Sequence, residues 1–114
     1  MVIFDQEGML ERIGDDKEIM VMVLNVFAED APTQLEGLKE SVASGDSDAL
    51  RRSAHTIKGA SANVSAMEMQ KTAFVLENKA KEGDLEGVDA LYQDLVAQYK
   101  AFEEHLNSLG LLEN

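Results

Sequence analysis

Residues 84–109 read DLEGVDALYQDLVAQYKAFEEHLNSL, and their apolar side chains recur at alternating spacings of three and four residues. This spacing places the side chains on one face of an α-helix, because an α-helix completes a turn every 3.6 residues. The series consists of Leu85, Val88, Tyr92, Leu95, Tyr99, Phe102, Leu106 and Leu109. Asp84 precedes it and is a favourable N-cap residue, so we predict a long amphipathic helix capped by Asp84.

A short helix and a longer one are predicted near the start of the chain. Asp5 is a favourable N-cap for the short helix, and Gly14 is a favourable C-terminal stop. Asp15 or Asp16 can cap the second helix, which we expect to reach Glu29 or Asp30, shortly before Pro32. Proline fits the first turn of a helix, so the residues after Pro32 form either a new helix or a bent continuation of the second one.

Gly45 ends this segment, and a further helix follows it. Asp46 or Ser47 can cap the new helix, which we expect to run to about Ala62. Residues 63–65 are then predicted to form a turn.

Ser65 and Glu68 have the Ser-x-x-Glu spacing of a capping box, which predicts another helix from this turn to near Gly83. Long helices joined by connections of only a few residues lie antiparallel to their neighbours and share one core. The predicted fold class is therefore all-α: an antiparallel four-helix bundle with a short additional N-terminal helix. No repeat, linker or low-complexity segment interrupts residues 1–114, which we expect to form a single domain.

The composition excludes several classes of function. The chain has 114 residues, of which 22 are acidic and 10 basic, and its formal net charge is −12. Because nucleic-acid binding depends on clustered Lys and Arg, this charge argues against DNA or RNA as a partner. The absence of cysteine excludes thiolate catalysis and zinc–cysteine sites, and it favours a cytoplasmic location. No apolar run approaches the roughly 20 residues of a membrane span, and residues 1–10 lack a basic flank before an apolar stretch, so we expect no membrane contact.

The helix predicted over residues 47–62 carries polar features on its outward face. At about 100° per residue, His55 lies roughly 130° from the centre of the apolar sector and faces solvent. Gly59 lies one turn further on, although a mid-helix glycine costs about 1 kcal/mol relative to alanine. Lys58 can place its ammonium beside an anion attached to His55, and an exposed imidazole is largely neutral and nucleophilic near pH 7. These residues predict a site for a transferable anionic group.

The neighbouring basic residues allow two interpretations. Arg51 and Arg52 either steer an anionic partner toward His55 or offset acidic neighbours such as Asp46 and Asp48.

Residues 54–66 read AHTIKGASANVSA, which resembles the signature of histidine phosphotransfer (HPt) domains, the phosphoryl carriers of multistep two-component relays. The opening from Phe4 to Gly14, the FAEDAP segment at residues 27–32 and the breaks at residues 45–46 and 82–85 also look like this family. The resemblance therefore covers essentially the whole chain. It implies a four-helix bundle with small additional helices.

The resemblance also implies a role for each site residue. His55 would accept a phosphoryl group from an aspartyl phosphate on one receiver domain and return it to the aspartate of another. Lys58 would stabilise the phosphoryl oxygens, and Gly59 would leave room for the receiver. Glu77, 22 residues after His55, matches the family position that holds the imidazole through one ring nitrogen. Ser65 departs from the family pattern, in which glycine is usual.

The expected partner is the receiver domain of a hybrid sensor kinase, of a response regulator, or of both, and we expect the carrier to be a monomer. The chain has no carboxylate cluster beside His55, and Asp48 is about two turns away, so we expect no cofactor of its own and assign Mg²⁺ to the receiver's acidic pocket. A glycine-rich nucleotide loop is also lacking, which predicts a phosphocarrier without kinase activity.

Two rival functions can be compared with this one. A di-metal carboxylate bundle needs inward-facing Glu-x-x-His pairs, but Arg52 and Phe102 stand three residues before the two histidines, His55 and His105. The other rival is a degenerate bundle that binds a receiver domain without phosphoryl transfer, and the presence of His55 distinguishes the carrier from it. His105 has neither a glycine nor a basic cluster beside it, so no function is assigned to it.

Overall fold

The computed structural model describes residues 3–113, and five α-helices account for the regular structure of this part of the chain. Their bounds are α1 (Gln6–Arg12), α2 (Lys17–Ser44), α3 (Ser47–Asn63), α4 (Met67–Lys81) and α5 (Val88–Ser108). The predicted all-α class is confirmed. Met1, Val2 and Asn114 belong to the predicted single domain but lie outside the described residues.

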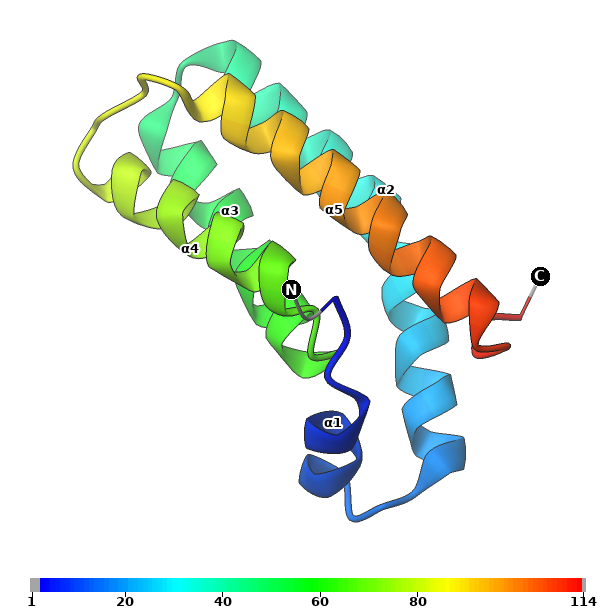
Figure 1. Cartoon of the computed structure of the whole chain (residues 1–114). Helices are drawn as coiled ribbons and strands as arrows, with labels where there is room; N and C mark the ends of the chain where they lie inside the picture. Colours follow the sequence, from blue (N-terminus) through cyan, green and yellow to red (C-terminus); the bar gives the residue numbers. More distant parts are fainter. Residues whose placement is uncertain (1–2, 114) are drawn as a thin grey trace.

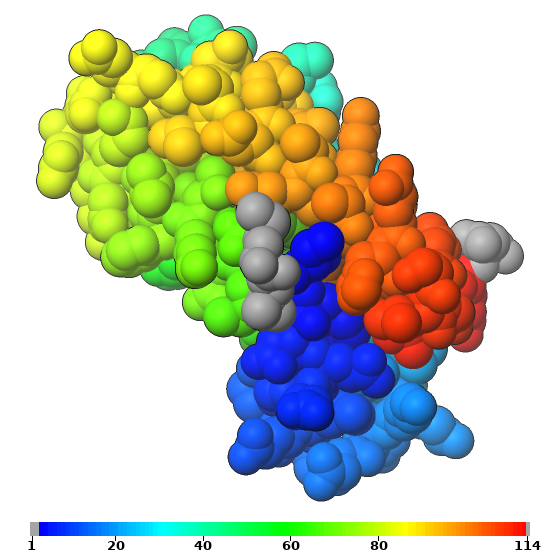
Figure 2. All heavy atoms as spheres, in the orientation of Figure 1, coloured from blue at the N-terminus to red at the C-terminus, as the bar shows by residue number. Residues whose placement is uncertain are grey.

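The four long helices form an antiparallel bundle in which each helix packs against the next one along the chain (Figure 1). Helix α3 lies between α2 and α4, and α5 closes the bundle by packing against both α4 and α2. The short helix α1 packs near the start of α2, and the segment before α1 lies between the start of α4 and the later part of α5 (Figure 2). No helix within residues 3–113 is both long and apolar enough to span a bilayer.

Apolar side chains from every helix meet in a single core. Three aromatic residues form an edge-to-face chain through it: the ring of Phe102 lies 5.7 Å from that of Phe4 and 5.5 Å from that of Phe27. Such edge-to-face contacts are favourable because the positive edge of one ring meets the negative face of the next. Fully buried aliphatic side chains surround them, among them Leu24, Leu38, Leu50, Leu76, Leu95 and Leu106.

Pro32 lies inside α2. Of the two alternatives left open by the sequence, the residues after Pro32 therefore continue the second helix and do not form a new one. A proline inside a helix removes the N–H that would bind the carbonyl four residues earlier, which here belongs to Ala28. The hydroxyl of Tyr99 on α5 donates a hydrogen bond to that carbonyl at 3.2 Å. A residue of another helix thus satisfies the group that Pro32 leaves unpaired.

Three predicted N-caps agree with the structure. Asp5, Asp16 and Asp46 each accept hydrogen bonds from backbone N–H groups in the first turns of α1, α2 and α3. Gly45 ends α2 in the left-handed conformation, with φ of 68°. These positions confirm the predicted starts of three helices and the predicted end of α2.

The prediction that Asp84 caps the last helix is wrong, because α5 begins at Val88. Gly83 and Gly87 both adopt positive φ, at 71° and 76°, and a helix cannot pass through such residues. Asp84 instead accepts hydrogen bonds from Lys79 on α4 and from the backbone N–H of Glu86. Of the predicted apolar series, Leu85 and Leu109 therefore fall outside α5.

The predicted capping box at Ser65 and Glu68 is also wrong. Ala66 is the N-cap residue of α4, without a side-chain hydrogen bond, and Ser65 has a positive φ of 55°. The Ser65 hydroxyl is turned toward α1, where it accepts a hydrogen bond from the guanidinium of Arg12 at 2.7 Å. The same guanidinium also donates to the carbonyls of Ala62 and Asn63 at the end of α3. Arg12 therefore occupies the C-terminal end of α3, where a cation is favourable.

Candidate functional site

Helix α3 holds His55 on its solvent-facing side. The buried residues of this helix are Leu50, Ala54, Ile57 and Ser61. The His55 side chain points away from them and is 65% exposed. The outward angle predicted for the imidazole is thus present in the structure.

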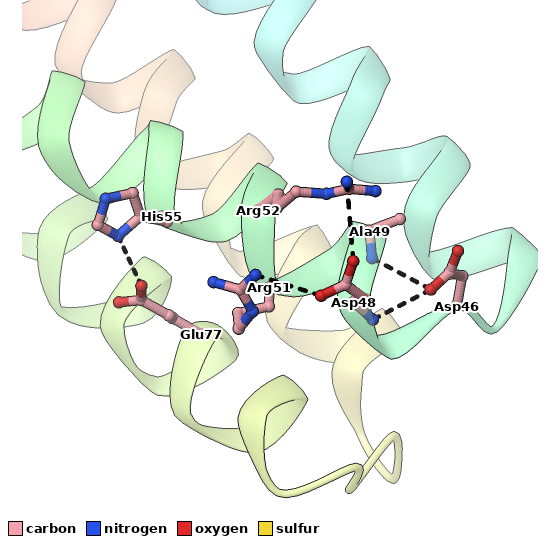
Figure 3. A network of polar contacts seen from close by, with 7 residues as sticks. All are labelled: Asp46, Asp48, Ala49, Arg51, Arg52, His55 and Glu77. Atoms are coloured by element: carbon pink, nitrogen blue, oxygen red, sulfur yellow. Dashed lines mark hydrogen bonds and ion pairs between the residues drawn. The ribbon is translucent and has the colours of Figure 1, made fainter.

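Glu77 on α4 fixes the orientation of the imidazole. The Nδ1 atom of His55 lies 2.6 Å from Oε2 of Glu77, and the two side chains point toward each other from neighbouring helices (Figure 3). Because an ionised carboxylate can only accept hydrogen bonds, the proton of the neutral imidazole lies on Nδ1. The lone pair is then on Nε2, the ring nitrogen that does not face Glu77.

Lys58 binds the other oxygen of the same carboxylate: its ammonium donates to Oε1 of Glu77. The Glu77 side chain is only 4% exposed, so this carboxylate is buried with two nitrogen partners. The hydrogen bond from Lys58 is the largest cause that lowers the pKa of Glu77 below its ordinary value. The hydrogen bond with His55 adds to the lowering, while desolvation opposes it.

Gly59 leaves open space on the outward side of α3. A Cβ atom built on this glycine would meet no neighbouring atom of residues 3–113 within 4 Å. Packing within the described part of the chain therefore does not require glycine here, although glycine weakens a helix.

Arg51 and Arg52 both pair with Asp48 on the same helix. Their guanidinium nitrogens lie 3.2 Å and 3.7 Å from its carboxylate oxygens (Figure 3). This arrangement supports the interpretation that they offset acidic neighbours. His105 lies apart from these residues on α5, where its ring packs against Phe4 at 6.5 Å.

A sequence model of the Hpt domain matches residues 22–108 of the chain. The chain belongs to the Hpt domain family. Its helical bundle is similar to the crystal structure of histidine-containing phosphotransfer protein B (HptB) from Pseudomonas aeruginosa PAO1, with a TM-score of 0.85. The similarity covers 93% of this chain and 92% of that one at 24% sequence identity, which supports a shared fold. A comparison with curated proteins gave no match.

As an Hpt domain, the chain is a histidine phosphocarrier. The four candidate site residues predicted from the sequence lie close together in the structure. The structure brings His55, Lys58 and Glu77 into one hydrogen-bonded group, with Gly59 one turn from His55 on the same helix. Glu77 is buried, unlike most glutamates of an amphipathic helix.

Exposed apolar side chains on α4 and α2 were not predicted from the sequence. Phe74 on α4 lies beside Lys58, whose ammonium is 5.6 Å from the centre of the ring. On α2, Ile19, Met22 and Val26 are also exposed. Their spacing of three and four residues was a detectable signal, because it gives α2 a second apolar stripe besides the one that faces the core.

Proposed function

We propose that this chain is a phosphohistidine carrier in which Nε2 of His55 accepts a phosphoryl group from the aspartyl phosphate of one receiver domain and passes it to the aspartate of another. The observation that carries this proposal is the exposed imidazole whose Nδ1 is bound by a buried carboxylate. That contact fixes the tautomer with a lone pair on Nε2 and leaves this atom accessible to a large partner.

The transfer step balances without any proton transfer. The Nε2 lone pair forms a bond to phosphorus while the phosphorus–oxygen bond to the aspartate breaks, and the electron pair stays on the aspartate carboxylate. The imidazole, which keeps its Nδ1 proton, becomes positively charged. Glu77 already lies 2.6 Å from Nδ1 and stabilises that charge. The reverse sequence delivers the phosphoryl group to the second receiver.

Within the carrier, Lys58 is the cation that stabilises the phosphoryl oxygens, since it shares Glu77 with His55. We assign the Mg²⁺ requirement to the receiver. Among residues 3–113, no group of three or more His, Cys, Asp or Glu side chains is placed to hold a metal ion. A magnesium ion bound to the receiver would neutralise charge on the phosphoryl group during transfer.

The receiver's docking surface extends from His55 across α3 to α2. A groove of about 160 Å³ lies between these helices and is lined by Val26 of α2 and by Ala60 and Asn63 of α3, among others. The exposed Ile19 and Met22 lie on the same face of α2 as Val26, so we extend the proposed surface along this helix. Gly59 has no side chain that would obstruct the receiver beside His55. In this proposal the carrier acts as a monomer.

The test is to incubate the purified chain with receiver domains from the same genome that carry a ³²P-labelled aspartyl phosphate. At least one receiver should label the chain, and the label should be lost in acid but survive base, as expected for a phosphoramidate. A label that survives acid, or no labelling by any receiver of the genome, would contradict the proposal.

A further inference from the structure

Phe74 is an exposed aromatic residue at the edge of the proposed site. Phe4, Phe27 and Phe102 are buried in the core, whereas Phe74 is 51% exposed. It lies three residues before Glu77 on α4, and residues at this spacing share one face of a helix. Core packing therefore does not account for the position of this ring.

The ring contacts the proposed phosphoryl-stabilising cation. The Lys58 ammonium lies 5.6 Å from the ring centre, within the roughly 6 Å range of a cation–π interaction. The same ammonium donates to Glu77, so two side chains of α4 hold a lysine of α3. The Lys58 side chain is 28% exposed, much less than the 72% of Lys71 on the outer face of α4.

The two contacts of Lys58 have different chemistry, and they respond differently to phosphorylation. A carboxylate binds the ammonium by its negative charge, so another anion can compete with it. A ring face attracts the ammonium through its quadrupole and has no net charge to exchange. When His55 becomes a positively charged phosphoimidazole, its imidazolium can neutralise the Glu77 carboxylate in place of Lys58. The ammonium can then turn to the phosphoryl oxygens while the aromatic face still limits its motion.

We propose that Phe74 is a positioning residue for phosphoryl transfer, whose ring confines the Lys58 ammonium beside His55 while its anionic partner changes from Glu77 to the phosphoryl group. This inference rests on the proposed function. It concerns how Lys58 is held, and part of its test needs no phosphoryl chemistry.

The first measurement is the NMR spectrum of the unphosphorylated chain. Protons held over an aromatic face are shifted upfield by the ring current, so the ε-methylene protons of Lys58 should resonate upfield of those of Lys71. Phe74→Tyr should keep this shift, and Phe74→Leu should remove it while the rest of the spectrum stays that of the folded bundle. Lys58 protons without an upfield shift in the wild type would overturn the inference, whatever the outcome of the transfer assay.

The second measurement is the rate of transfer from a labelled receiver domain that phosphorylates the wild-type chain. Phe74→Leu should lower the maximal rate about two- to five-fold, the factor that corresponds to an exposed cation–π contact. The receiver concentration that gives half the maximal rate should be unchanged. Phe74→Tyr should restore the rate, and Val75→Ala, at the adjacent exposed residue of α4, should transfer as the wild type does.

The dependence on Lys58 separates positioning from docking. In a Lys58→Met background, Phe74→Leu should cause no further loss of rate, because no ammonium remains for the ring to hold. An equal loss in both backgrounds would overturn the inference. A higher half-saturating receiver concentration with an unchanged maximal rate would also overturn it, and would make Phe74 a docking contact. A wild-type rate in Phe74→Leu contradicts it as well.

Discussion

Glu77 both fixes the tautomer of the His55 imidazole and links α4 to α3. Its carboxylate is buried, which is costly for a charged group unless partners compensate it. Lys58 and His55 supply that compensation from α3, one on each oxygen. The carboxylate therefore fixes the tautomer of the imidazole and links the two helices that form the site.

The lowered pKa of Glu77 predicts a pH-dependent contribution to stability. Its folded-state pKa lies below the ordinary value of 4.5. The contribution of this group to the free energy of unfolding is then fully present above that value, and it is lost as the pH falls through the lower folded-state pKa. Urea denaturation between pH 7 and pH 3 should show a smaller loss of stability on acidification in Glu77→Gln than in the wild type.

Lys58→Met provides the matched control, because Lys58 is the largest cause of the shift. This variant should remove most of the same pH dependence while leaving Glu77 in place. Identical acid sensitivity of the wild type and both variants would show that the carboxylate is not held by these partners.

Helix α3 combines a regular buried face with an outward face shaped for access. A large side chain at Gly59 would meet none of the described atoms near its Cβ, yet it would stand one turn from His55 in the proposed path of the receiver. Gly59→Leu should therefore block phosphoryl transfer. The same variant should raise the free energy of unfolding by about 1 kcal/mol, because leucine favours a helix more than glycine does.

Transfer assays and chemical denaturation on one preparation of Gly59→Leu check both effects. Gly59→Ala should show a similar gain in stability with a smaller loss of transfer. A folded Gly59→Leu chain that transfers at the wild-type rate would refute the clearance argument.

Helix α2 depends on a contact with α5 at its proline. Tyr99→Phe removes the hydroxyl that binds the half-buried Ala28 carbonyl, and the loss should cost about 1 kcal/mol, the low end for an acceptor left unpaired. In a Pro32→Ala background, the alanine N–H can bind that carbonyl instead, so the same substitution should cost less. Thermal or chemical denaturation of the four variants measures the coupling between the two residues. Equal costs of Tyr99→Phe in both backgrounds would show that the hydroxyl does not serve the proline.

The elements that could be predicted from the sequence are those governed by local rules. The helices follow from an apolar period of 3.6 residues, and Asp5, Asp16 and Asp46 cap residues that are their near neighbours in the chain. The turns were harder to predict, because contacts with residues far away in the sequence determine their backbone conformation. Ser65 is held in the left-handed conformation with a hydrogen bond from Arg12, 53 residues away.

The same distinction applies to the site. The outward angle of His55 and the neighbouring Lys58 and Gly59 follow from positions on one helix. The burial of Glu77 depends on how α4 packs on α3, which the 22-residue separation alone does not fix. Phe74 had no local signal, because its contact with Lys58 joins two helices.

At the scale of the whole molecule, the strong negative charge bears on the source of magnesium. The net charge of −12 attracts cations in general, but among residues 3–113 no grouping of acidic and histidine side chains has the form of a metal site. Magnesium should therefore leave the His55 imidazole NMR signals of the isolated chain unchanged. Transfer to and from a receiver should nevertheless be lost when EDTA removes the metal and should return when Mg²⁺ is added. Saturable perturbation of the His55 signals by Mg²⁺ in the isolated chain would contradict this division of roles.

The chain has two histidines, which allows a direct test of its proposed role as a carrier. The measurement is transfer of ³²P from a labelled receiver domain to the wild type, His55→Gln and His105→Gln, with circular dichroism confirming that all three are folded. Our account predicts no label on His55→Gln and wild-type labelling of His105→Gln. Undiminished labelling of a folded His55→Gln chain would contradict it.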